Sequence, residues 1–523
     1  MHTDTLPKTI RPFGHVNAEE DDLLVEAFHH VPHAELATDQ ETTILVGRRG
    51  AGKTALGVYL KRLRPDLYSV TLDIDKKKAL AQVILAIDTA LKESRSTSSD
   101  LMADLWTFVI WTKTAMRLCE HPAFAGFEGR EDLKVCLELL GIDDRAQILA
   151  HLKEFFGRPG PDGARPSINQ ALLAVSATLD SEEFQELQRQ IRRFLDQGND
   201  ILAVIDTIED YRVREPSVDQ ALAGLLAAVS AFGGSTPHPR FHVKCFFPAE
   251  IYPYITTARA VNLRKIDQRL QHLKWTPRQL FVMLCRRLAA WLEAHLPETF
   301  DGMSTGLDWR DLHAVRERVW TRVFPPFVKN RRGMVEESFL YIARHTHLHP
   351  GHLIWMCNRI AQLAREAGAF PPVVAPEHVV AGVRNIESEV ANSIMAPYRA
   401  IYPNIHEVVT SAFRQSPPIL RISDALRLYR KAAQVWPREY IAMDDWTLIT
   451  MAAEVGAIGK VRKQTSQYHV AQFRYHMDAE LTFEKDDLCA IHPAFYRLFE
   501  TTSDPADSRT VCPIVITDEA DDD

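Results

Sequence analysis

Short strand-like runs separated by long helical stretches organise the first half of the chain. Residues 44–46, 68–74, 201–205 and 241–247 are rich in apolar and β-branched residues and have lengths typical of strands. Between 76 and 198 apolar residues instead recur mainly at helical spacing. This alternation predicts an α/β fold, in which a parallel sheet has helices on both faces and carries a large helical insertion.

The second half of the chain has a different pattern. After the fourth strand, helical periodicity continues through about residue 400. Residues 405–500 begin with helical segments and end with alternating segments at 467–476 and 479–485. That order predicts a small helix-plus-hairpin domain.

The N-terminal region precedes the first strand and is polar and acidic. The segment 17–31 predicts a short helix with Asn17 as the N-cap and acidic residues in its first turn. Its expected apolar face consists of Leu23, Leu24, Ala27 and Phe28.

Composition narrows the class of protein. The chain has 523 residues, enough for two to four domains, and its 61 Lys+Arg against 69 Asp+Glu give a net charge of −8. That balance argues against nucleic-acid binding over the whole surface but leaves a local basic face open. Its 7 cysteines form no CxxC pair, which predicts a reduced cytoplasmic protein. Without a signal sequence or an apolar run of about 18 residues, we expect no membrane association.

The segment after the first strand carries the clearest chemical signal. Residues 47–54, GRRGAGKT, match the phosphate-loop pattern GxxxxGK[ST] between a predicted strand and a predicted helix. Backbone N–H groups of such a loop surround phosphates, with Lys53 over the β- and γ-phosphates and the Thr54 hydroxyl on Mg²⁺. The predicted ATP-binding residues are Gly47, Gly50, Ala51, Gly52, Lys53, Thr54 and Ala55.

A second metal anchor is expected at the tip of a neighbouring strand. Asp206 directly follows the apolar run 201–205 and is predicted to hold Mg²⁺ together with Thr54. Many ATPases place a glutamate base directly after this aspartate, but Thr207 stands there. Glu209 or Asp210 is therefore expected to polarise the attacking water, and the predicted catalytic residues are Lys53, Asp206 and Glu209.

Several strings together resemble a family of bacterial P-loop ATPases. FGHVNAEEDDLLVEAF, ILVGRRGAGKTAL, VIDTIEDY, KIDQRLQHLKWTPRQLFVMLCRRL and YIARHTHLHPGHLIWMCNRI look like STAND- and AAA-related ATPases, often encoded in genome-defence or mobile-element loci. The resemblance covers roughly residues 10–400. It implies ATP binding, slow hydrolysis and an initiator-like order of a P-loop NTPase core, a helical lid and a C-terminal winged helix.

With this order, the expected domains follow the pattern along the chain. They are a lead-in (1–40), the ATPase core with its insertion (41–260), a helical lid (261–400), a winged-helix-like domain (405–500) and an acidic tail (501–523).

The chain departs from the family at two sensor positions. Relatives carry an arginine pair around a lid proline, whereas this chain has histidines on either side of Pro350-Gly351. Arg344 and Arg359 are the candidates to replace that arginine. At the end of the fourth strand, where a polar sensor is expected, Glu250 is the candidate.

Two other groups of side chains have a functional and a structural interpretation. The segment 345–352 holds four histidines, but Pro350 interrupts the helix that a metal site would need, so a lid turn is favoured. The segment 329–333, KNRRG, offers an arginine to a neighbour's nucleotide or forms a solvated loop.

The C-terminal domain has a local excess of positive charge. Residues 412–476 contain ten Lys/Arg against five Asp/Glu, a local net charge of +5 with interleaved aromatics. A winged helix with such a face could bind DNA phosphates, although contact with a protein or support of the lid is favoured.

These observations predict an ATP-switched regulatory ATPase. The resemblance places it in antiphage (antiviral) or mobile-element defence, signalling to a protein partner, or by self-assembly, through the lid and C-terminal domain. The alternatives are a DNA-binding initiator-like or transposition-helper ATPase and a nucleotide-held scaffold with little turnover.

Overall fold

The protein consists of two compact units. The computed structural model describes residues 9–26, 28, 35, 38–39, 41–63, 70–73, 87, 99–142, 168–206, 216–233, 237–257, 268–370, 373–433, 445–476, 481–502 and 507–513. One unit, which we call the sheet unit, is His30–Lys274. The other, which we call the composite unit, combines Met1–His29 with Trp275–Asp523.

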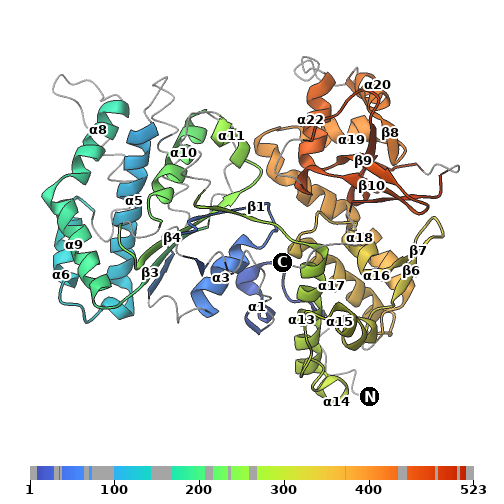
Figure 1. Ribbon diagram of the computed structural model, residues 1–523, viewed down its shortest axis with the longest axis horizontal. Coiled ribbons are helices and arrows are strands. Elements are labelled where there is room, and N and C mark those ends of the chain that lie inside the picture. The colour runs from blue at the N-terminus through green and yellow to red at the C-terminus, as the bar shows by residue number, and fades with distance from the viewer. Residues whose placement is uncertain are drawn as a thin grey trace. The chain divides into compact units, whose positions relative to one another are not determined.

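A five-stranded parallel sheet forms the centre of the sheet unit (Figure 1). The strands run in the order β2-β3-β4-β1-β5. Their bounds are β1 Ile44–Gly47, β2 Val70–Asp73, β3 Ile201–Ile205, β4 Phe241–Pro248 and β5 Leu270–Leu273. The four predicted strands and the parallel sheet are confirmed.

The fifth strand was not predicted, and the expectation of continuous helix after the fourth strand is wrong. β5 lies at the edge of the sheet, next to β1. Three of its four residues are only half-buried, and its sequence LQHL lacks the apolar run of the central strands. An edge strand has one free side and needs less apolar character, so periodicity does not reveal it.

Helices cover both faces of this sheet. Cys245 and Phe247 of β4 share one apolar core with residues of α5 Ser99–Glu120 and α10 Pro216–Ser230. Phe246 points to the opposite face, because successive residues of a strand alternate. There it meets α3 Lys53–Leu63, since a Cβ added to Gly57 would lie 3.4 Å from the Phe246 ring.

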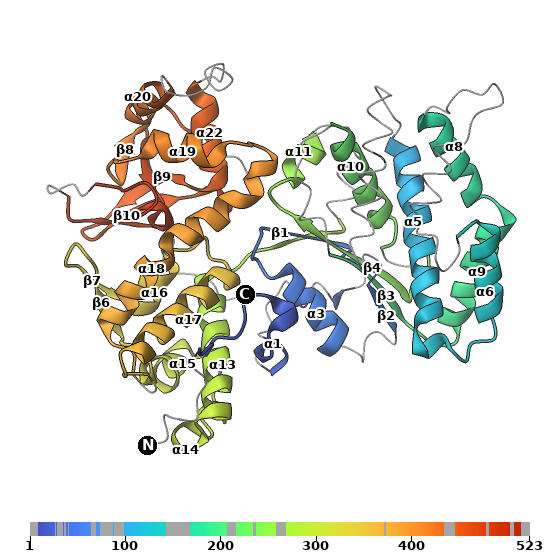
Figure 2. The same ribbon diagram turned by 180° about the vertical axis from the view of Figure 1, so that it is seen from behind.

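The helical insertion is confirmed over its described residues. It contains α5, α6 Arg130–Leu139, α8 Ile168–Leu179 and α9 Glu182–Asp196, with η3 Pro122–Phe124 between the first two. α6 packs against α9, and α5 packs against α8 (Figure 2). α9 begins at its N-cap Ser181, whose side chain accepts a hydrogen bond from the Phe184 N–H. The sequence also predicts loops at 94–99 and 156–167, and these lie outside the described residues except for Ser99, which is the first residue of α5 rather than part of a loop. The unit's remaining described helix is α11 Tyr252–Thr257.

Helices dominate the first part of the composite unit. They are α13 Pro277–His295, α14 Pro297–Phe300, α15 Leu312–Arg318, η5 Trp320–Arg322, α16 Ser338–Ala343, α17 Pro350–Glu366, α18 Pro376–Met395 and η6 Ala396–Ala400. A two-stranded hairpin, β6 Phe327–Lys329 and β7 Val335–Glu337, interrupts them. This hairpin is the second exception to the predicted helical stretch. Strands of three residues are too short to show a period.

A mixed sheet, accompanied by three α-helices among the described residues, forms the C-terminal part of the composite unit. Its strand order is β12-β10-β9-β11-β8. The elements are α19 Ile405–Phe413, β8 Ile419–Arg421, α20 Ile422–Ala433, α22 Asp445–Val455, β9 Ile458–Gln464, β10 Tyr468–Gln472, η7 Arg474–His476, β11 Leu488–Ile491, η8 Pro493–Phe495 and β12 Thr510–Cys512. β10 pairs with β9, and residues 481–485 form no strand, so the predicted second hairpin strand at 479–485 is wrong. β12 lies in the range predicted as an acidic tail.

The N-terminal segment is held against α13 and α17 by buried polar contacts. Asn17 caps a short helix, η2 Ala18–Glu20, as predicted, and α1 Leu23–Glu26 follows. The chain leaves helical geometry at Asp21 between them, so the predicted continuous helix is wrong. Asp21 instead pairs with Arg287 of α13 at 2.7 Å, with both side chains buried. The N–H of Phe13 donates to Asn358 of α17.

A buried lysine predicts a pH-dependent stability of the sheet unit. The amino group of Lys244 on β4 donates to the carbonyl oxygens of Asp39 and Thr42, and burial lowers its pKa to about 7. An unfolded lysine keeps its proton to about pH 10.4, so between pH 7 and 10 the unfolded state binds more protons and stability rises with pH.

We expect Lys244→Met to remove this slope, which reaches about 1.4 kcal/mol per pH unit. Urea unfolding of both proteins at pH 7, 8 and 9 measures it. Lys61→Met, at a half-exposed lysine paired with Asp73, is the control and should keep the slope. Equal slopes in wild type and Lys244→Met would contradict the assignment.

The described helices include none that is both long and apolar enough to cross a membrane.

Candidate phosphate-binding site

The predicted phosphate loop connects β1 to α3. Gly50 and Gly52 have φ values of 84° and 94°, a conformation that side-chain-bearing residues rarely adopt. At Gly47 an added Cβ would lie 3.2 Å from Leu273 of β5 and 3.3 Å from Lys53, closer than ordinary packing allows. Backbone conformation therefore favours glycine at Gly50 and Gly52, whereas at Gly47 a side chain would need Leu273 or Lys53 to shift slightly.

Lys53 is the first residue of α3 and is 3% exposed. Its amino group donates to the carbonyl oxygens of Gly47 at 2.9 Å and Arg48 at 3.1 Å. The lysine amino group thus lies against the backbone of the same loop that is predicted to bind the phosphates.

The other predicted ligand residues surround the start of the same helix. The N–H of Ala51 donates to the Arg48 carbonyl at 3.0 Å and closes a turn within the loop. Ala51 is buried, while Thr54 and Ala55 are half-buried in the first turn of α3. The loop thus delivers the Thr54 hydroxyl at the N-terminus of a helix, where the dipole favours an anion.

Asp206 lies beside that helix. It follows β3, which is separated from β1 by β4 alone. An added Cβ on Gly57 would lie 3.9 Å from the Asp206 Oδ2 atom. Gly57 follows Thr54 by three residues, so both occupy the same side of α3. The structure therefore brings the two predicted magnesium ligands to the same region, although they are 152 positions apart in the sequence.

The predicted water-polarising residues are not placed. Glu209 and its alternative Asp210 lie outside the described residues, so Glu209 stays a prediction.

Glu250, the candidate polar sensor, contacts the loop directly. It follows β4, is 7% exposed, and its Oε1 accepts a hydrogen bond from the Arg49 N–H at 2.9 Å. Its Oε2 is buried and has no hydrogen-bond partner among the described residues. The sequence signal was the position of Glu250 at the end of the fourth strand, where a polar side chain was expected.

The two candidate sensor arginines are engaged within the composite unit. Arg344 pairs with Glu336 at 2.9 Å, and both side chains are buried. Glu336 raises the pKa of Arg344 against the opposing effect of burial, which keeps its guanidinium charged. Arg359 donates to Asn385 at 3.0 Å on the surface of α17.

The histidine-rich segment forms a buried turn. His349 is the N-cap of α17, which begins at Pro350, so the histidines do not share one continuous helix. His347 stacks on Tyr475 with ring centroids 4.3 Å apart. Within the described part of the chain, no three His, Cys, Asp or Glu side chains are grouped so as to hold a metal ion. The structural interpretation of this segment is therefore favoured.

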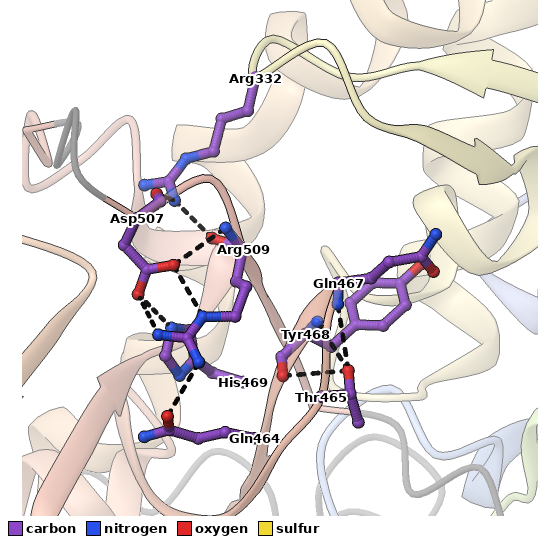
Figure 3. A network of polar contacts seen from close by, with 8 residues as sticks. All are labelled: Arg332, Gln464, Thr465, Gln467, Tyr468, His469, Asp507 and Arg509. Atoms are coloured by element: carbon purple, nitrogen blue, oxygen red, sulfur yellow. Dashed lines mark hydrogen bonds and ion pairs between the residues drawn. The ribbon is translucent and has the colours of Figure 1, made fainter.

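The arginines of the β6–β7 hairpin differ in their surroundings. Arg332 donates to the carbonyl oxygens of Asp507 and Arg509, which precede β12 of the mixed sheet (Figure 3). Hydrogen bonds, chiefly from Arg509, hold the pKa of the Asp507 carboxyl below its ordinary value. Arg331 is exposed. Arg332 thus fastens the hairpin to the C-terminal part of its own unit.

The positive charge of residues 412–476 is partly neutralised. Arg414, Arg427, Arg430 and Lys460 each pair with a carboxylate, on Glu500, Asp424, Asp445 and Asp487 respectively. Helix α22 contains acidic residues but no lysine or arginine, and most of its residues are buried. Of the aromatics, Tyr429 and Phe473 are buried, as expected of core residues.

Neither a search of protein-family models nor a search of curated proteins matched this chain.

Proposed function

We propose that the protein binds ATP with Mg²⁺ at the loop between β1 and α3 and hydrolyses it slowly as a regulatory switch. One observation carries the proposal: the glycine loop, the buried Lys53 and the Asp206 carboxylate converge on the start of one helix. This arrangement supports the proposal, because a triphosphate and its metal are bound by a glycine loop, its lysine and a strand-end aspartate in P-loop proteins.

The topology supports a P-loop NTPase core. In an open α/β sheet, ligands bind at the carboxyl ends of the strands, and the loop, Asp206 and Glu250 all follow such ends. The order β2-β3-β4-β1-β5 puts one strand between the loop strand and the Asp206 strand.

The donor set fits magnesium. A threonine hydroxyl and an aspartate carboxylate are oxygen ligands, and Mg²⁺ is usually bound by one or two protein oxygens together with phosphates and water. The metal would neutralise phosphate charge when bound. Lys53 would bind the β- and γ-phosphates, and Glu209 or Asp210 would orient water.

The composite unit supports a lid and a winged-helix-like domain. Helices α13 to α18 precede a run from α19 to β10 whose described elements follow the order helix–strand–helix–helix–strand–strand, which is typical of winged helices. We propose that ATP changes the state of this unit, which signals to a protein partner or to further copies of the chain. A role in antiphage or mobile-element defence rests on the family resemblance alone.

Binding of DNA is the alternative. The third helix of a winged helix normally enters the major groove, but α22 is mostly buried and carries no basic residue. Tyr402 also donates to Glu454 on this helix at 2.7 Å. These contacts favour a protein partner.

Phosphate release tests the proposal. The 523-residue protein should release phosphate from ATP in the presence of Mg²⁺, and this release should stop when EDTA is added. At low salt, duplex DNA should neither bind to the protein nor accelerate phosphate release. Tight ATP binding without release would support the nucleotide-held scaffold, and salt-sensitive DNA binding would support the initiator-like ATPase. Absence of ATP binding would overturn the proposal.

A further inference from the structure

We propose that Glu250 restrains the phosphate loop and weakens its affinity for ATP, so that this one carboxylate sets the threshold of the switch. The inference rests on the proposed function. It adds a regulatory residue to the site.

Pairing between two strands positions Glu250. β1 and β4 are parallel neighbours, with Gly47 opposite Pro248. The N–H of Ala249 donates to the Gly47 carbonyl at 3.1 Å, so the chain leaving β4 runs alongside the start of the loop. Glu250 is the next residue, and its carboxylate accepts the Arg49 N–H at 2.9 Å.

The loop is held from two sides in this arrangement. Glu250 occupies the N–H of Arg49, while Lys53 occupies the carbonyl oxygens of Gly47 and Arg48. Three successive residues are thereby fixed by side chains rather than by phosphate. A phosphate that draws on Lys53 or on the Arg49 N–H would compete with these contacts.

Burial makes the Glu250 carboxylate energetically unfavourable. Glu250 is 7% exposed, and one of its oxygens is buried without a partner in the described part of the chain. A buried carboxylate normally has an ion-pair partner or several hydrogen bonds. Arg49 supplies one hydrogen bond, so the remaining acceptor capacity faces the interior beside the loop.

Charge gives the direction of the effect. A phosphate bound in the loop would lie close to this carboxylate, and like charges at a few ångströms repel with little screening in a buried site. Glu250 would therefore lower the affinity for ATP in two ways, by stabilising the empty loop and by repelling the bound phosphate. Any event that moves the connection between β4 and α11 would remove both effects.

Two substitutions separate the charge from the hydrogen bond. Glu250→Gln keeps the acceptor and removes the charge, while Glu250→Ala removes both. Calorimetric titration of the full chain with ATP and Mg²⁺ should show affinity at least about ten-fold tighter in each. Glu41→Gln is the control, because it also removes one negative charge. Glu41 precedes β1, lies at the end of that strand away from the loop, and pairs with Arg269.

The outcomes distinguish this inference from the proposed function. Tighter binding by both Glu250 variants, with the control unchanged, supports the restraint. If wild type binds ATP and either folded Glu250 variant binds it with equal or lower affinity, the restraint is overturned and the proposed ATP-binding function stands. If wild type and all variants fail to bind ATP, the proposed function fails, and the restraint fails with it. Circular dichroism melting establishes that each variant is folded.

Discussion

Replacing Lys53 with methionine is expected to abolish ATP binding at micromolar concentrations, a loss of at least about 100-fold in affinity. Methionine retains much of the apolar stem but carries no charge for the phosphates. Lys53 is buried at the start of α3 and already contacts the loop backbone through its amino group. No other lysine lies within residues 47–54, and the two loop arginines, Arg48 and Arg49, are half-buried and exposed rather than buried at the start of α3.

A second lysine on the same helix provides the control. Lys61 pairs with Asp73 at 3.0 Å and is partly exposed. Lys61→Met should bind ATP as wild type does, by calorimetric titration, while Lys53→Met shows no binding heat. Retained affinity in Lys53→Met would mean that the nucleotide binds elsewhere.

Replacing Arg287 with methionine is expected to destabilise the composite unit by about 3–5 kcal/mol. Arg287 and Asp21 form an ion pair whose side chains are 6% and 1% exposed, and Arg287 also donates to the Phe13 carbonyl. The substitution leaves the Asp21 carboxylate buried without its cation.

An exposed pair in the same unit measures the importance of burial. Arg414 and Glu500 lie 2.9 Å apart, with side chains 61% and 50% exposed. Arg414→Met should cost at most about 1 kcal/mol in guanidinium unfolding. Equal losses in the two variants would show that burial of the Asp21–Arg287 pair does not govern its contribution.

The core of the candidate site could be predicted because its strands are buried on both faces. Continuous apolar runs at 201–205 and 241–247, and the shorter run that enters the loop at 44–46, show in the sequence itself. The glycines and Lys53 follow from the local demands of phosphate binding. Asp206 follows from the rule that strand ends meet at one edge of a parallel sheet.

The remainder depends on contacts between distant residues. The Glu250 hydrogen bond joins positions 201 residues apart and exists because β1 and β4 happen to pair. The buried Asp21–Arg287 pair likewise cannot be inferred from charged residues that look solvated in the sequence. The edge strand β5 and the β6–β7 hairpin were missed because short or half-exposed strands carry no period.

The central claim is that Asp206 and the loop share one metal–triphosphate complex. Calorimetric titration with ATP tests this claim, once with Mg²⁺ and once with EDTA in its place. The proteins compared are wild type, Asp206→Asn and the control Asp200→Asn, whose substitution lies at the opposite end of β3. We expect Mg²⁺ to strengthen ATP binding roughly ten-fold in wild type and Asp200→Asn, and to have almost no effect in Asp206→Asn. The same magnesium dependence in all three proteins would contradict the account.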